Sequence, residues 1–88
     1  MKELTVRLLE DIKKTILEKM YRNGYIGARH TAEDSLPKGF PSHRRGEVKD
    51  AVKELIKEGL LIPKPTSYGL QVSLNKYRIA EIERIIKT

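Results

Sequence analysis

The sequence predicts a small α+β domain that is mainly α-helical, with a three-helix core, a β-hairpin and a C-terminal helix. Three observations predict this fold. Residues 3–22 and 42–58 carry apolar side chains at helical spacing. Residues 60–74 have the pattern of two short strands joined by a turn, and residues 75–87 that of an amphipathic helix. Because a chain of 88 residues has room for only a modest core, residues 1–88 are expected to form a single domain.

The first helix is expected over residues 3–22. Apolar residues recur there mostly at intervals of three and four, so one face should be buried: Leu8, Leu9, Ile12, Ile16, Leu17 and Met20. Asn23 and Gly24 suit a left-handed turn that ends the helix. Residues 25–30 then form a connector, with room for a brief strand that pairs with the hairpin.

A short second helix should follow the connector. Thr31 is expected to cap it, with Glu33 and Asp34 in the first turn, where the helix dipole favours negative charge. Pro37 and Gly39 should stop this helix after about a turn and a half. A turn then leads into the third helix.

The third helix is amphipathic in two ways. Ser42 is expected to cap its start and Gly59 to end it. One flank is apolar and suited to packing: Val48, Ala51, Val52, Leu55 and Ile56. The rest of the surface separates by sign into a basic edge of Arg45, Lys49, Lys53 and Lys57 and an acidic edge of Glu47, Asp50, Glu54 and Glu58.

Gly46 is placed on the outward side of this third helix, where glycine costs about 1 kcal/mol relative to alanine. Two explanations remain open at this stage. A phosphate or the hairpin approaches the helix closely at this point, or the helix start is frayed.

The hairpin and the last helix complete the chain. Residues 60–65 are an apolar run closed by two prolines, residues 66–69 supply turn residues, and residues 70–74 alternate between apolar and polar. Asn75 is expected to cap a helix that reaches Lys87. Its apolar face either completes the core or forms the interface of a homodimer, so the chain is expected to be a monomer or a homodimer: Ile79, Ile82, Ile85 and Ile86.

This order of elements resembles the winged helix-turn-helix superfamily of prokaryotic and archaeal type. The resemblance covers nearly the full chain, and its most specific match is residues 52–61, VKELIKEGLL, which look like the end of a recognition helix entering the first wing strand. The turn over residues 36–41 is longer and richer in proline than the usual pattern. The resemblance implies a recognition helix, beginning at residue 42, in the DNA major groove and a wing on the backbone.

Carried onto this chain, the resemblance implies ten DNA-contacting residues: Ser42, His43, Arg44, Arg45, Lys49 and Lys53 on the helix, and Lys64, Thr66, Ser67 and Tyr68 on the wing. Arginine can read guanine with two hydrogen bonds, whereas lysine more often contacts phosphate. The simpler alternative is that the helical charges form a solvated, salt-bridged face. Tyr68 either touches DNA or folds back over the hairpin.

The charge balance agrees with a polyanionic partner. The formal net charge is +6 and the sequence pI is about 9.7, although a merely soluble surface would also account for them. We therefore expect a protein that binds double-stranded DNA, either a transcriptional regulator or an architectural factor. The alternative is a protein-protein interaction module, which the acidic edge favours because it would repel phosphates. RNA is a weaker third option, because the chain has only five aromatic residues.

Residues for catalysis or metal binding are missing from the sequence. The chain has no cysteine, its two histidines, His30 and His43, have no metal-site spacing, and glycine-rich phosphate loops and Ser/His/Asp sets are absent. We expect no enzyme activity, no cofactor and no metal. Without a long apolar run or signal peptide after Met1, no membrane association and a cytoplasmic location are expected. Few amides and many Lys, Glu, Arg and Ile residues predict a thermophilic archaeal source.

Overall fold

The computed structural model describes residues 2–88, with side chains from residue 7 onward. This part of the chain is α+β and mainly helical. Its elements, with η for a 3₁₀ helix, are α1 (Lys2–Arg22), β1 (Thr31–Ala32), η1 (Glu33–Gly39), η2 (Ser42–Arg44), α2 (Arg45–Lys57), β2 (Leu61–Thr66), β3 (Gly69–Leu74), η3 (Lys76–Arg78) and α3 (Ile79–Lys87). None of these helices is both long and apolar enough to span a bilayer.

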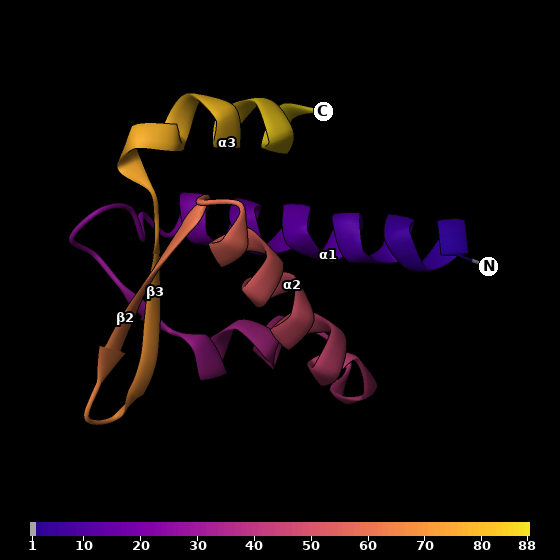
Figure 1. The fold of residues 1–88 in the computed structure, drawn as a ribbon, viewed down its shortest axis with the longest axis horizontal. Helices are drawn as coiled ribbons and strands as arrows, with labels where there is room; N and C mark the ends of the chain where they lie inside the picture. Colours follow the sequence, from indigo (N-terminus) through magenta and orange to yellow (C-terminus); the bar gives the residue numbers. More distant parts are fainter. Residues whose placement is uncertain (1) are drawn as a thin grey trace.

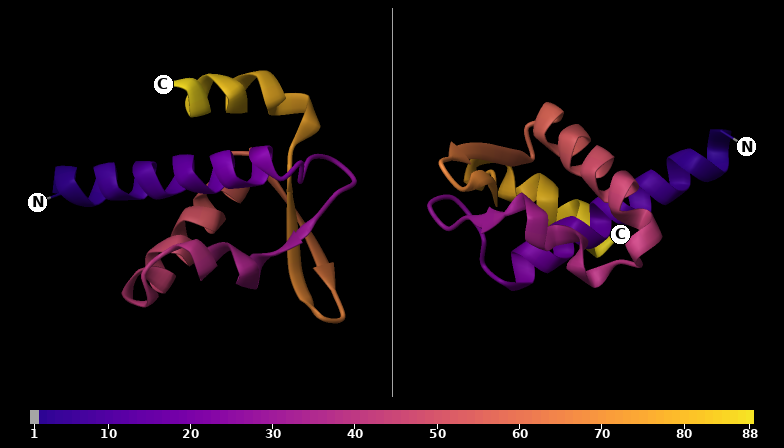
Figure 2. Two further views of the ribbon diagram at one scale, coloured as in Figure 1. Left: turned by 180° about the vertical axis from the view of Figure 1, so that it is seen from behind. Right: turned by 90° about the horizontal axis from the view of Figure 1, so that it is seen from below.

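Helix α1 lies through the middle of the molecule (Figure 1). Helix α3 runs alongside it, while α2 descends from the other side of α1 toward η1. The hairpin of β2 and β3 extends in the same direction as α2, so the hairpin tip, η1 and the start of α2 all lie on the side away from α3 (Figures 1 and 2).

The core is built from the predicted apolar faces. Four apolar residues of α1 and four of α2 are buried, and Leu8 and Leu9 are partly buried, as the helical periodicity predicts. Helix α3 adds Ile82, and the sheet adds its inner side chains. The buried apolar residues of the described chain are Ile12, Ile16, Leu17, Met20, Leu36, Val48, Ala51, Val52, Leu55, Leu60, Leu61, Val72, Leu74 and Ile82.

The sheet has the strand order β1-β3-β2 and is antiparallel. Its main pairing runs from Leu61 opposite Leu74 to Thr66 opposite Gly69, which confirms the predicted hairpin. Strand β2, which carries both prolines, is an edge strand, where a missing N–H is tolerated. Val72 and Leu74 are buried in the core, so the alternate residues of each strand face outward.

The expected cap at Thr31 is wrong. Thr31 pairs with Val72 in β1, and the cap position of η1 falls on Ala32, which makes no side-chain cap hydrogen bond. The brief strand expected within residues 25–30 also lies later in the chain, because within that stretch only Ile26 forms a bridge, with Leu74. Pairing with β3 gives the backbone at Thr31 an extended conformation, so its hydroxyl lies instead 3.3 Å from that of Ser35.

The short helix ends at Gly39, one of the two residues predicted to stop it, and not at Pro37. It is a 3₁₀ helix that continues to Gly39 with Pro37 inside it, and the Pro37 carbonyl accepts the N–H of Phe40 at 2.9 Å. The proline has no N–H to donate, but its carbonyl can still accept this bond. The cap expected at Ser42 is also wrong: Ser42 lies inside η2, whose backbone bonds the Arg44 N–H to the Pro41 carbonyl at 2.9 Å.

The predicted ends of α2 and of the hairpin are confirmed. Gly59 has φ +78°, and the N–H groups of Gly59 and Leu60 bond to the carbonyls of Ile56 and Leu55, both at 3.0 Å, as in a Schellman motif. Asn75 caps η3, the 3₁₀ turn that leads into α3, by accepting the N–H of Tyr77 at 3.0 Å. Its amide also donates to the Gly59 carbonyl at 2.8 Å, so one side chain links the end of α2 to the start of η3.

Candidate nucleic-acid interface

The basic edge of α2 is solvent-exposed. Its four cations are four residues apart, so they form one stripe along the helix. No ion pair to a carboxylate is formed by any of them among the side chains that the structure describes: Arg45, Lys49, Lys53 and Lys57. The alternative of a salt-bridged face is therefore not seen on the basic edge, and the charges of these four residues are available to a partner.

Part of the acidic edge lies beside α1, and two of its carboxylates are paired with cations. The Glu58 carboxylate forms an ion pair with the Lys13 ammonium of α1, with Nζ and Oε1 2.7 Å apart. The Glu47 carboxylate forms one with the Arg44 guanidinium of η2, at 2.9 Å. Glu47 and Asp50 also border a cleft whose other wall is the apolar side of α1. Glu47, Asp50 and Glu58 thus lie on the α1 side of α2, and the pairing of Glu47 and Glu58 weakens their repulsion of a polyanion at the basic edge.

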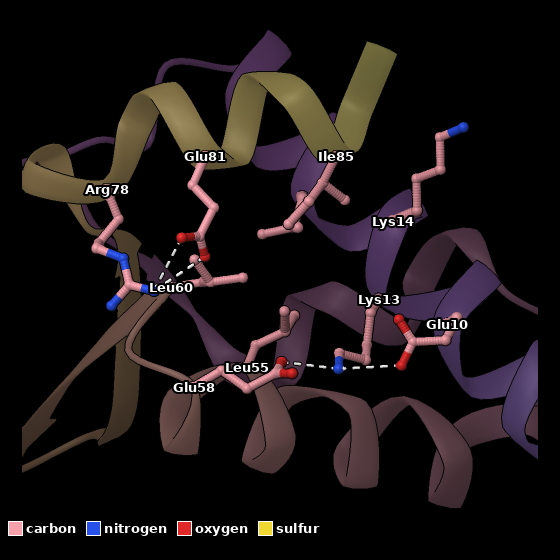
Figure 3. A pocket seen from close by; sticks show the side chains of 10 residues that line it. Glu10, Lys13, Lys14, Leu55, Glu58, Leu60, Arg78, Glu81 and Ile85 are labelled. Atoms are coloured by element: carbon pink, nitrogen blue, oxygen red, sulfur yellow. Dashed lines mark hydrogen bonds and ion pairs between the residues drawn. The ribbon is translucent and has the colours of Figure 1, made fainter. Parts of the chain in front are cut away.

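Lys13 lies at the junction of the three α-helices (Figure 3). Its side chain is 8% exposed, and its Nζ lies 2.7 Å from Glu58 and 3.3 Å from Glu10. Burial, the largest single influence, lowers the pKa of Lys13, but the hydrogen bonds and charges of Glu58 and Glu10 together raise it above its ordinary value of 10.5. Lys13 lines a pocket of 380 Å³ between the helices, and on the opposite wall of this pocket Arg78 pairs with Glu81. The paired charges make this junction structural.

A groove of 350 Å³ lies beside the start of α2. It is lined on the η1 side by Asp34, Pro37 and Lys38 and on the α2 side by Arg45, Gly46 and Lys49. Three cations and one carboxylate therefore surround this opening. Lys38 was not among the candidate residues predicted from the sequence. Lys38 belongs to a different element from Arg45 and Lys49, so no spacing along one helix links them, and only the packing of η1 against α2 brings them together.

Gly46 opens onto this groove. A Cβ built at Gly46 meets no atom within 4 Å outside its own helix and immediate neighbours, so the hairpin does not approach it in the described chain. This excludes one of the explanations considered for the glycine, a close approach by the wing. Its lack of a side chain instead leaves open space between Arg45 and Lys49.

The predicted helix residues fall into two groups. Ser42 and His43 are exposed in η2, and Arg45, Lys49 and Lys53 are exposed on α2. Arg44 differs, because it is half-buried and one nitrogen of its guanidinium contacts both oxygens of Glu47, at 2.9 and 3.1 Å. Its charge is used within the protein, so a role in placing Glu47 fits it better than direct contact with a ligand.

The predicted wing residues lie at and near the hairpin tip. Tyr68 is 97% exposed, which excludes its folding back over the hairpin. The Thr66 hydroxyl donates to the Gly69 carbonyl at 2.7 Å and accepts the Tyr68 N–H at 3.2 Å, so it shapes the turn. Lys64 and Ser67 are exposed. The tip and the start of α2 reach the same side of the molecule, on either side of η1 (Figure 1).

Comparison of the chain with protein-family models gave no match, and comparisons with curated proteins and with solved structures gave none either.

Proposed function

We propose that the chain is a winged helix-turn-helix protein that binds double-stranded DNA as a transcriptional regulator or an architectural factor. In this proposal α2 is the recognition helix, the β2–β3 hairpin is the wing, and η1 with η2 leads into the recognition helix. The observation that carries the proposal is the basic edge of α2, exposed and without internal ion pairs.

The groove beside Gly46 gives the proposal its detail. Lys38, Arg45 and Lys49 surround a space beside Gly46. Because Gly46 has no side chain to fill this space, a phosphate can approach the helix backbone there. Arg45 is suited to reading a guanine edge, and the lysines are suited to phosphates. The exposed hairpin tip, with Tyr68 and Ser67, is free to contact the flanking backbone.

The test is the salt dependence of duplex binding. Each lost phosphate contact lowers the slope of log K against log salt by about one unit, so Arg45→Ala and Lys49→Ala should weaken binding and flatten the slope by that amount. Arg84→Ala is the matched control, because Arg84 is an exposed cation on α3, away from the proposed interface. Fluorescence anisotropy with labelled duplex at several salt concentrations measures both quantities. The proposal fails if Arg45→Ala and Lys49→Ala both bind with the affinity and the salt slope of the unsubstituted protein.

A second candidate is a protein-interaction winged helix, which one observation favours. Leu8, Leu9 and Ile12 of α1 form an apolar cleft of 220 Å³ whose rim carries Glu47 and Asp50. An apolar helix with basic flanks would complement such a cleft. The duplex titration separates the two functions, since a protein that binds no random duplex at low salt would point to the cleft instead.

A further inference from the structure

The sheet has an outer face that the duplex proposal does not use. Ile62 pairs with Ser73 and Lys64 with Gln71. Ile62 and Lys64 are exposed on this face, whereas Gln71 is half-buried and Ser73 is buried. Above them, the connector after α1 and the start of η3 close a groove of 350 Å³. Its lining includes His30, Ile62, Ser73, Lys76 and Tyr77.

This groove combines an aromatic surface with positive charge. Tyr77 is 84% exposed, and the Lys76 ammonium lies 5.2 Å from the centre of its ring. Ile62 is 43% exposed, an uncommon level for a large apolar residue in this molecule. None of the residues that line the groove carries a carboxylate, in contrast to the grooves beside α2.

The backbone that carries Tyr77 is held by hydrogen bonds. The Tyr77 N–H bonds to the Asn75 side chain at 3.0 Å, and the Asn75 amide bonds to the Gly59 carbonyl at 2.8 Å. The backbone under the ring is thus tied to the end of α2. A fixed backbone at this point sets where the ring begins, which reduces the part of the chain that must be ordered when a ligand binds.

We propose that this outer sheet face binds a segment of single-stranded DNA, with a base stacked on Tyr77 and phosphates near Lys76 and Lys64. Exposed aromatic rings in a cationic, carboxylate-free groove are the features by which proteins bind single strands without sequence preference. The groove volume of 350 Å³ lies within the range of ligand sites, about 300–1,000 Å³.

DNA is chosen over RNA for two reasons. The Asn75 side chain is engaged at both its oxygen and its nitrogen and the Ser73 side chain is buried, so neither is free to recognise a 2′-hydroxyl. The second reason rests on the proposed function, because a protein that binds duplex DNA works among DNA strands. The stacking site itself does not depend on that function.

The experiment measures the affinity for a labelled dT oligonucleotide at low salt. Tyr77→Ala should weaken binding roughly five-fold or more, which is the loss expected when one stacked base is removed. Tyr77→Phe keeps the ring and should keep the affinity. Both variants are expected to fold, because the Tyr77 side chain is exposed. Equal affinity of Tyr77→Ala and the unsubstituted protein, or no binding of dT by the unsubstituted protein, overturns the site and favours a protein partner for this face.

Two further arms separate the possible failures. Arg45→Ala with Lys49→Ala should weaken duplex binding and leave dT binding unchanged, so loss of the duplex function alone does not remove the single-strand site. Tighter binding of a U oligonucleotide than of dT overturns the choice of DNA.

The chain has no tryptophan, so Tyr77→Trp adds a fluorophore that dT should quench by stacking. Tyr21→Trp, outside the groove, should report no quenching.

Discussion

The side chain of Lys13 lies almost entirely within the protein, although lysine is rarely buried without a partner. Its ammonium reaches the pocket between the α-helices, where Glu58 and Glu10 accept it (Figure 3). Glu58 belongs to the acidic edge of α2, so this bond also joins α2 to α1. A charge pattern on one helix is thus explained by a residue on another.

Lys13→Met should lower the free energy of unfolding by about 1–2 kcal/mol, because it keeps the apolar stem and removes hydrogen bonds between charged groups. The loss is moderate because Glu58 is 44% exposed and water can solvate it. Urea unfolding measures the change. Glu10→Gln is the control and should cost less, since the Glu10 side chain is 62% exposed and lies farther from Nζ. Equal losses in both variants would contradict this account.

The same contact predicts a dependence of stability on alkaline pH. The pKa of Lys13 is raised above 10.5 in the folded protein, so its contribution is fully present below 10.5 and is lost as the pH rises through the folded pKa. The difference in unfolding free energy between the unsubstituted protein and Lys13→Met should therefore shrink above pH 10.5. A difference that stays constant through the alkaline range would show that Lys13 acts by packing alone.

At the scale of the element, two glycines have opposite physical roles, one in the first turn of α2 and one just after its end. Gly46, the second residue of the helix, has open space where a Cβ would lie and no positive φ. Gly59 ends the helix at φ +78°, where a side chain is strained, and the nearest atom to its Cβ position is a nitrogen of Arg78 at 3.3 Å. The sequence predicted the stop at Gly59 correctly, because a left-handed C-terminal glycine is a local signal.

Gly46→Ala should stabilise the protein by up to about 1 kcal/mol, whereas Gly59→Ala should destabilise it by about that amount. Thermal unfolding of the two variants measures the contrast. If Gly46 leaves room for a phosphate, Gly46→Ala should also weaken duplex binding in spite of its greater stability. A stabilised variant with unchanged affinity would mean that the glycine serves no ligand.

The starts of the helices were harder to predict than their ends. Thr31 and Ser42 have the composition of caps, yet one lies in a strand and the other inside a 3₁₀ turn. Capping preference is a local tendency, and pairing with β3 or continuation of a backbone turn satisfies the same groups differently. The apolar faces of α1, α2 and α3 were predicted correctly, since the burial of a whole face depends on many residues at once.

At the scale of the whole molecule, α3 completes the core from the far side of α1. Ile82 is fully buried, and its neighbours Ile79, Ile85 and Ile86 are partly buried against the same cluster. Tyr21 of α1 adds a hydrogen bond of 2.5 Å to Glu83 on α3. Of the two roles considered for these isoleucines, completion of the core is the one that the structure displays.

Ile82→Ala should lower the free energy of unfolding by about 2–5 kcal/mol, the range for a large-to-small change in a core. Ile86→Ala should cost clearly less, because Ile86 is only partly buried. Denaturant unfolding followed by circular dichroism compares the two. Losses of similar size would indicate that α3 is held by its exposed edge, or by a second copy of the chain, in place of Ile82.

The linear order of residues was enough to predict the helical faces, the hairpin with its turn, the stop at Gly59 and the cap at Asn75, because each depends on residues close together in the chain. It was not enough to show that the acidic edge lies against Lys13, that Lys38 joins Arg45 and Lys49, or that His30, Ile62 and Tyr77 share one groove. Those groupings join residues from separate elements. These residues come together when the elements pack around a common core. The periodicity within one helix or strand predicts which face is buried, but it does not specify which other element packs against that face.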